Sequence, residues 1–241
     1  MDLTTGLIAW ASYWLGYITF MNLLPGDHVP PERKRIIAAV VFRNCITTLI
    51  LSAIVSKIFE SLPTVSAAWY FSWPLSYIIM DAVFYCFHRA LHWPVLYQQH
   101  KQHHSINFAY PAAALYCSNL EAATDLISHS IGPLIFGFGR VEICAWSAFI
   151  AVHSLVLHSK LEPRYHLSHH IRQNCNYGIT AIFDWIADTK YTPRSLREMH
   201  AIVNMPLKKS AQNNNNQLVE DQPTRGYELA DCLDIARGSN I

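Results

Sequence analysis

Long apolar segments separated by short polar ones dominate the first part of the chain. Residues 7–24 contain no charged side chain, and residues 36–59 are interrupted by Arg43 near their start. Residues 65–87 contain one acid, Asp81. About 20 apolar residues in a helix cross the hydrocarbon core of a bilayer, so the pattern predicts three spans. An ionisable group within a span usually faces the protein interior, so we expect Asp81 to support a site.

A further apolar region, residues 109–158, is divided by glycines, prolines and charged residues. We expect a helical hairpin or two short spans there. The sequence after residue 204 is polar and includes an asparagine run, and such a composition buries too little apolar surface to fold alone. The sequence therefore predicts an all-α membrane domain over residues 1–203 and a disordered tail over residues 204–241.

Composition and charge exclude some classes of partner and of structure. The 241 residues are 51% hydrophobic and 15% charged, and 18 basic against 17 acidic residues give a net charge of +1. This balance provides no extended basic surface, which excludes nucleic acid as a partner. The six cysteines form no C-x-x-C pair, so we expect isolated thiols and no disulfide framework.

Basic residues predict the orientation of the spans. Arg33, Lys34 and Arg35 lie between the first two apolar segments, and basic loops next to spans stay in the cytoplasm. Counting spans from this loop brings residues 88–104 and 153–170 to the cytoplasmic face. These two segments hold ten of the 13 histidines.

The histidines are spaced for metal binding. His88 and His92 are four residues apart, which places both rings on one face of a helix. Two copies of the pattern H-x-x-H-H follow, formed by His100, His103 and His104 and by His166, His169 and His170. Neutral imidazole is the commonest protein ligand of metals, so the three clusters predict a transition-metal site.

Eight imidazoles exceed what one ion binds while it keeps an open position, so the number of histidines favours a binuclear site. We expect a ninth ligand from the returning hairpin. His153 is preferred to His158, because residues five apart diverge on a regular helix. His129 lies in an apolar segment and stays open, either as a ligand or as a core residue.

Imidazole alone does not select among iron, zinc, copper and nickel. The H-E-x-x-H motif of zinc hydrolases and the Glu-x-x-His pairs of soluble di-iron bundles are both absent from the sequence. The leading interpretation is an iron centre that activates O2 against C–H bonds of a lipid. The alternative is a membrane protein that binds or transports metal or haem without oxidation chemistry.

The ordered motifs HRALH, HKQHH and HLSHH resemble the histidine boxes of the fatty acid hydroxylase and sterol desaturase superfamily of membrane di-iron oxygenases. The resemblance includes the Leu-Tyr pair between the first two boxes and the Asn-Tyr-Gly and aspartate after the last, and it covers about residues 69–191. It implies about four transmembrane helices under a cytosolic helical cap. It also implies two iron ions, with zinc as a substitute in the isolated protein, O2 as cosubstrate, electrons from cytochrome b5 or an equivalent donor, and a place in the endoplasmic reticulum.

The resemblance also assigns roles to residues. The metal ligands, which would be the catalytic residues, are His88, His92, His100, His103, His104, His153, His166, His169 and His170, with His158 as a further candidate. Four polar residues would lie behind them: Asp81, Glu121, Asn176 and Asp184. Groups of this kind orient imidazoles through their second nitrogen, and Asp184 is the preferred carboxylate for that role.

One motif departs from the superfamily. Many relatives carry His-Pro-x-Glu after the second box, whereas residues 116–121 read YCSNLE, which keeps Glu121 and lacks the histidine. Cholesterol 25-hydroxylases look similar at this point, and residues 174–176, Asn-Cys-Asn, also resemble that group. This favours hydroxylation of a sterol or long-chain lipid. Desaturation, as in sterol C-5 desaturases, stays open because both reactions begin with the same hydrogen abstraction.

Overall fold

The computed structural model describes residues 2–60, 63–161 and 165–191. These residues form eight α-helices, one 3₁₀ turn and no strand, which confirms the all-α prediction for this part of the chain. The elements are α1 (Leu3–Phe20), α2 (Pro31–Phe59), α3 (Trp69–Leu91), α4 (Tyr97–His104), η1 (Pro111–Ala113), α5 (Asn119–Phe136), α6 (Arg140–Leu157), α7 (His166–Arg172) and α8 (Ala181–Ile186). The predicted boundary at residue 204 and the predicted tail lie outside the described residues.

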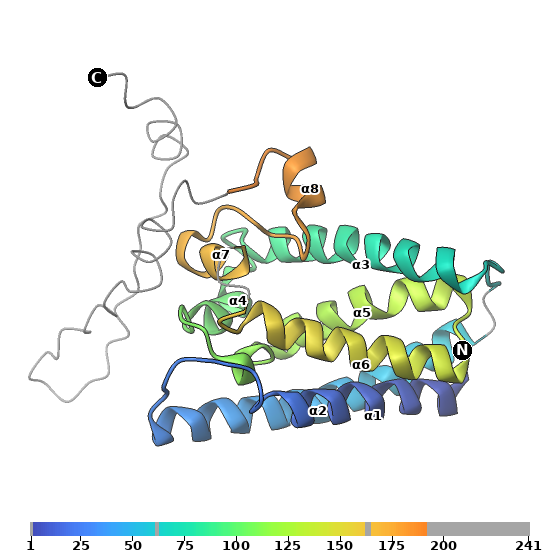
Figure 1. Cartoon of the computed structure of the whole chain (residues 1–241), viewed down its shortest axis with the longest axis horizontal. Helices are drawn as coiled ribbons and strands as arrows, with labels where there is room; N and C mark the ends of the chain where they lie inside the picture. The colour runs from blue at the N-terminus through green and yellow to red at the C-terminus, as the bar shows by residue number, and fades with distance from the viewer. Residues whose placement is uncertain (1, 61–62, 162–164, 192–241) are drawn as a thin grey trace, which may run out of the picture. The chain divides into compact units, whose positions relative to one another are not determined.

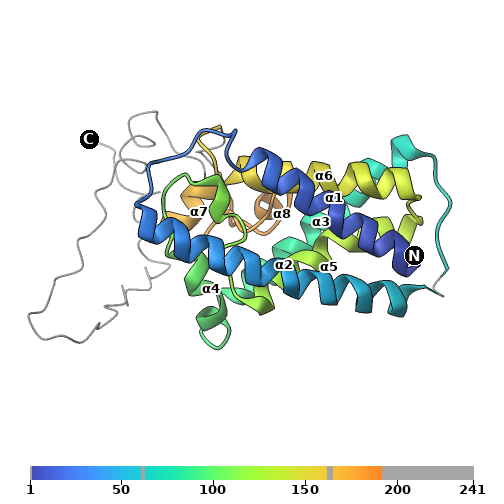
Figure 2. The same cartoon turned by 90° about the horizontal axis from the view of Figure 1, so that it is seen from below.

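The five long helices lie side by side (Figure 1). Helix α1 packs against α6 and α2, and α5 packs against α3 and α2 (Figure 2). Large apolar side chains from different helices fill the space between them, such as Trp14 of α1, Met80 of α3 and Trp146 of α6, each at most 5% exposed. Such burial supplies the main free energy that holds helices together when their surroundings are aqueous, and close packing does so in lipid.

The hairpin predicted within residues 109–158 is formed by α5 and α6. The Ser118 side chain accepts a hydrogen bond from the backbone N–H of Glu121 and so caps the first turn of α5. Gly137 ends α5 with a left-handed φ of 61°, which a residue without Cβ adopts at no steric cost. The Glu142 side chain then accepts from the N–H of Gly139 and begins α6.

Two of the described helices are long and apolar enough to cross a membrane, over residues 31–58 and 140–157. Helices α1 and α3 are rich in tryptophan, tyrosine, serine and threonine, which lower their mean hydropathy. The count of four spans therefore stays a prediction.

The short helices α4 and α7 lie at one end of the bundle, where α3 and α6 also end (Figure 1). All three histidine clusters are on these elements. The convergence of the clusters at one end of the molecule, expected from the order of the spans, is therefore observed.

Candidate metal centre

Nine imidazoles form two neighbouring groups at this end of the bundle. The nitrogen atoms that each group offers to a metal lie within 4.8 Å of one another. The first group consists of His88, His92, His100, His104 and His169, and the second consists of His103, His158, His166 and His170. Both groups draw on α4 and α7, so neither forms unless these two short helices dock on the ends of α3 and α6.

In the first group the Nε2 atoms converge. Nε2 of His100 lies 3.0 Å from Nε2 of His88 and 2.9 Å from that of His104. Nε2 of His104 lies 3.2 Å from the Nε2 atoms of both His92 and His169. Residues of three helices, α3, α4 and α7, thus direct the same ring atom at one point.

The second group repeats this arrangement. Nε2 of His158 lies 3.3 Å from Nε2 of His103 and 3.2 Å from Nε2 of His166. Nε2 of His170 lies 3.1 Å from Nε2 of His166. The rings of His104 and His170 have centroids 4.9 Å apart, so the two groups are in direct contact.

Backbone carbonyls fix which ring nitrogen carries the proton. Nδ1 of His88 lies 2.6 Å from the carbonyl oxygen of Tyr177, and Nδ1 of His169 lies 2.6 Å from that of Cys175. A carbonyl oxygen only accepts, so each Nδ1 donates and each Nε2 of the neutral ring presents a lone pair. Lone pairs that face one another at these distances repel. A cation between them removes the conflict, so the donor set fits a metal ion.

His158 follows the same rule, since its Nδ1 lies 2.9 Å from the carbonyl oxygen of Ser154. Burial lowers the pKa of His158 to about 4. Burial, with repulsion from neighbouring imidazoles, also holds the pKa of His104 and His170 well below the usual value. These rings are therefore neutral near pH 7, which is the form that binds metal.

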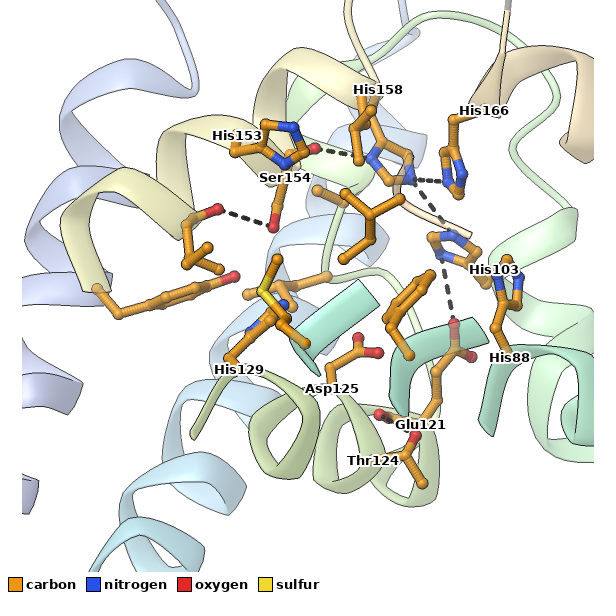
Figure 3. Close-up of a pocket in the computed structure, with 18 of the residues that line it drawn as sticks. His88, His103, Glu121, Thr124, Asp125, His129, His153, Ser154, His158 and His166 are labelled. Atoms are coloured by element: carbon orange, nitrogen blue, oxygen red, sulfur yellow. Dashed lines mark hydrogen bonds and ion pairs between the residues drawn. The ribbon is translucent and has the colours of Figure 1, made fainter. Parts of the chain in front are cut away.

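Glu121 is the carboxylate closest to both groups. Its Oε2 lies 3.0 Å from Nδ1 of His100. Its Oε1 lies 3.9 Å from Nδ1 of His103, a contact drawn in Figure 3. Both contacts are at ion-pair distance without hydrogen-bond geometry. The Ser118 cap fixes this position, because it starts α5 so that Glu121 falls in the first turn.

Asp184 lies behind the centre. The sequence predicts that its carboxylate contacts an imidazole, but the structure shows it bound to other groups. Its carboxylate accepts from the backbone N–H groups of Tyr177 and Gly178 at 2.9 and 2.7 Å and from the hydroxyl of Tyr165 at 2.5 Å. The carbonyl oxygen of the same Tyr177 accepts a hydrogen bond from Nδ1 of His88. The carbonyl of Tyr177 therefore takes the place beside Nδ1 of His88 that a carboxylate would otherwise occupy. Asp184 positions His88 indirectly, by holding the backbone of Tyr177.

Asp81 and Asn176 hold the same loop. Asp81 is fully buried and accepts from the backbone N–H groups of Ile179 and Thr180 and from the Thr180 hydroxyl. The Asn176 amide bonds the backbone of Tyr191 in both directions, at 3.0 and 2.7 Å. Asp81 thus faces the protein interior, as the sequence indicated.

Gly178 explains the Asn-Tyr-Gly motif. A Cβ at this position would lie 2.9 Å from Asp184 Oδ2, 3.0 Å from Asp81 Oδ1 and 2.7 Å from the carbonyl oxygen of Thr180. A residue without a side chain is therefore needed where the loop passes between the two carboxylates.

The structure differs from the expectation for His153. Nε2 of His153 lies 3.1 Å from the Tyr77 hydroxyl, and the ring belongs to neither group, whereas His158 belongs to the second. Five helical positions rotate a side chain by about 140° net, so the two rings cannot reach one point. His158 follows the last residue of α6 and meets α4 and α7, whereas His153 lies more than one turn earlier.

His129 is also outside both groups. It lies two helical turns after Glu121, about 12 Å along α5, and its ring stacks on Tyr13 with centroids 6.2 Å apart. It does not replace the histidine that is absent from residues 116–121.

An apolar cavity adjoins the centre (Figure 3). His88, His103, His158 and His166 line one end, and the remaining wall includes Met80, Phe84, Leu91, Ile150 and Leu157. The space between the lining atoms, part of which is open to solvent, amounts to about 650 Å³. Both imidazole groups thus border a space that suits an apolar ligand.

Comparison with known proteins agrees with this geometry. The family model described as fatty acid hydroxylase matches residues 73–189, which include all nine clustered histidines and the loop held by Asp184. Residues 73–189 of this chain belong to the fatty acid hydroxylase superfamily.

Several curated relatives share this domain. The chain is 26% identical to fatty acid hydroxylase domain-containing protein 2 of Homo sapiens, over 52% of this chain and 41% of the relative. It is 30% identical to methylsterol monooxygenase 1 of Danio rerio, over 45% and 42%, and 23% identical to Delta(7)-sterol 5(6)-desaturase of Leptosphaeria maculans, over 57% and 42%. The matches thus span less than half the length of these relatives. No solved structure matches the chain.

Two functional positions of this fatty acid hydroxylase domain escape sequence reasoning. Tyr177 and Cys175 act through their backbone carbonyls, which accept hydrogen bonds from Nδ1 of His88 and His169. Backbone acceptors leave no side-chain signal. Asn176, between them, has a left-handed φ of 55°, and asparagine is among the residues that adopt this conformation most readily.

Proposed function

We propose that the chain is a membrane oxygenase that hydroxylates or desaturates a sterol or long-chain lipid, using two iron ions, O2 and electrons from a cytochrome b5-type donor. The observation that carries this proposal is the convergence of nine imidazoles in two groups beside an apolar cavity. Relatives named as sterol desaturase and methylsterol monooxygenase support the same chemical class.

The chain's residues would divide the work. The nine clustered histidines would hold the two iron ions, and Glu121 and the carbonyls of Cys175 and Tyr177 would keep the rings oriented. Bound iron would supply, together with O2, the oxidising power that an unactivated C–H bond requires. Apolar residues such as Phe84 and Leu157 would place the lipid and exclude water.

The surface of α2 supports contact with lipid. Its exposed residues Phe42, Ile46, Ile50, Ile54 and Ile58 recur every fourth position, and each is 47–67% exposed. A continuous apolar stripe of this length is unfavourable in water and favourable in a bilayer.

The position of the basic loop supports a cytosolic metal site. Arg33, in the first turn of α2, donates a hydrogen bond to the carbonyl oxygen of Ser105 at 2.7 Å, one residue after His104. The basic segment and the histidines therefore lie at the same end of the bundle, where a soluble electron donor would reach the centre. We propose the endoplasmic reticulum membrane as its location.

The test is lipid analysis after expression in a host that lacks this activity. Wild type should yield a lipid with one added oxygen atom or two fewer hydrogen atoms, detected by mass spectrometry. His166→Ala should abolish this product, and His28→Ala, which changes an exposed histidine outside both groups, should retain it. A protein that holds metal fully and yields no oxidised lipid when given O2 and reductant would be a metal-binding protein, contrary to the proposal.

A further inference from the structure

Helix α5 carries a polar stripe that the metal centre uses only in part. Glu121, Asp125 and His129 follow one another at every fourth position, which places them on one face of the helix. Glu121 contacts the imidazoles. Asp125 and His129 lie one and two turns farther along and line the cavity instead.

Asp125 is unpaired. Its carboxylate makes no hydrogen bond and no ion pair with any residue that the structure describes, and Figure 3 shows it pointing into the cavity. The neighbouring walls include Leu115 and Ile150. A carboxylate kept in apolar surroundings is costly unless a hydrogen-bond donor meets it, so this position favours a ligand that brings one.

Asp125 also marks the place where two cavities meet. Tyr13, Asp125 and His129 line both the cavity at the metal centre and a second one. The second cavity, with about 740 Å³ of empty space including a part open to solvent, is walled mainly by apolar and aromatic side chains, such as Trp10, Trp14, Val55, Leu126 and Trp146. A lipid that occupies both cavities therefore passes this polar point.

We propose that Asp125, with Tyr13 and His129, binds the hydroxyl group of a neutral lipid alcohol whose apolar body fills the second cavity. A hydroxyl can donate to the carboxylate and accept from the phenol or the imidazole, so both its proton and its oxygen find a partner. A fatty acid fits poorly, because its ionised carboxylate brings no hydrogen-bond donor to Asp125. Sterols and long-chain alcohols share the required chemistry.

The site also limits which carbon is oxidised. Asp125 follows Glu121 by one helical turn, about 5–6 Å along the axis, and Glu121 touches the imidazoles. The oxidised carbon therefore lies within a few bonds of the carbon that bears the hydroxyl. This second part rests on the proposed function, whereas the binding site stands without it.

Equilibrium binding to the full-length protein in nanodiscs tests the site. The probes are radiolabelled cholesterol, cholest-5-ene, which lacks the hydroxyl, oleyl alcohol and oleic acid, measured without O2 or reductant. Wild type should bind cholesterol about tenfold tighter than cholest-5-ene, or oleyl alcohol about tenfold tighter than oleic acid. Cholesterol and oleyl alcohol form separate arms, and preference for one identifies the source of the hydroxyl.

Asp125→Leu should remove this preference, and the isosteric Asp125→Asn, whose amide oxygen still accepts, should reduce it. Both should leave binding of cholest-5-ene unchanged, which also shows that the variants are folded. Ser128→Ala is the matched control, because its hydroxyl bonds the carbonyl of Thr124 and lines neither cavity. Equal weakening of hydroxylated and deoxygenated lipids, no weakening, or preference for oleic acid would overturn the proposal. A chain that binds alcohols but oxidises none would refute only the proposed function.

Discussion

Glu121 places Oε2 3.0 Å from Nδ1 of His100. Its other oxygen lies 3.9 Å from Nδ1 of His103, and the two histidines belong to different groups. One buried carboxyl group therefore contacts rings that would ligate both metal ions. A carboxylate behind a ligating imidazole fixes the ring and raises its basicity, so Glu121 links the occupancy of the two positions.

Replacing Glu121 should weaken metal binding at both positions. We expect Glu121→Gln to lower metal affinity by about 10–100-fold, the usual effect of losing such a partner. Chelator titration followed by metal analysis measures this. Glu32→Gln, which alters an exposed glutamate at the start of α2, should leave the affinity unchanged. Equal retention of metal in both variants would contradict the role of Glu121.

His158 and His153 provide a second, paired test. Because only His158 lies in a group, His158→Ala should lose about one metal ion per chain, whereas His153→Ala should keep both. Metal content of the purified variants decides the matter. Loss of metal from the His153 variant alone would reverse the assignment.

Asp184 should contribute mainly to stability. In Asp184→Asn, one of the two carboxylate oxygens that accept from the backbone N–H groups of Tyr177 and Gly178 becomes an NH₂ group, which cannot accept. Each backbone N–H left without an acceptor lowers the free energy of unfolding by about 1–3 kcal/mol. Thermal unfolding should show a lowered midpoint. Asp188→Asn, an exposed position with a left-handed φ that asparagine tolerates, should change little. A midpoint unaffected by Asp184→Asn would contradict this role.

The metal-free protein should lose stability in mild acid. Burial lowers the pKa of His158 from 6.5 to about 4, so between these values the unfolded chain binds a proton that the folded chain does not. Stability therefore falls as pH drops below about 6.5, by up to about 1.4 kcal/mol per pH unit for each such histidine. The pKa values of His104 and His170 are also lowered, so several rings act together. A melting temperature constant between about pH 7.5 and pH 5 would contradict this.

Much of the site could be predicted because helical spacing is a local property. The four-residue interval between His88 and His92 and the repeated H-x-x-H-H pattern determine which rings share a helix face, and these rings do converge. The all-α fold follows from long apolar segments in the same way. The turn chemistry of Ser118 and Gly137 marks where α5 begins and ends.

The structure differs from the sequence predictions where tertiary contacts decide. His153 and His158 lie on the same helix, and which ring meets the centre depends on where α6 ends relative to α4 and α7. The role of Asp184 depends on backbone carbonyls that leave no trace in the sequence. The four-residue intervals from Glu121 to Asp125 and from Asp125 to His129 are the sequence signal of the polar stripe on α5.

The most direct test of the central claim is the metal content of the purified full-length protein produced in iron-supplemented medium, measured by mass spectrometry of the elements. Two groups of converging imidazoles predict about two iron ions per chain, which His104→Ala and His170→Ala, one from each group, should each reduce. Fewer than about one metal ion per chain in the wild type, or a content that neither substitution changes, would contradict the account.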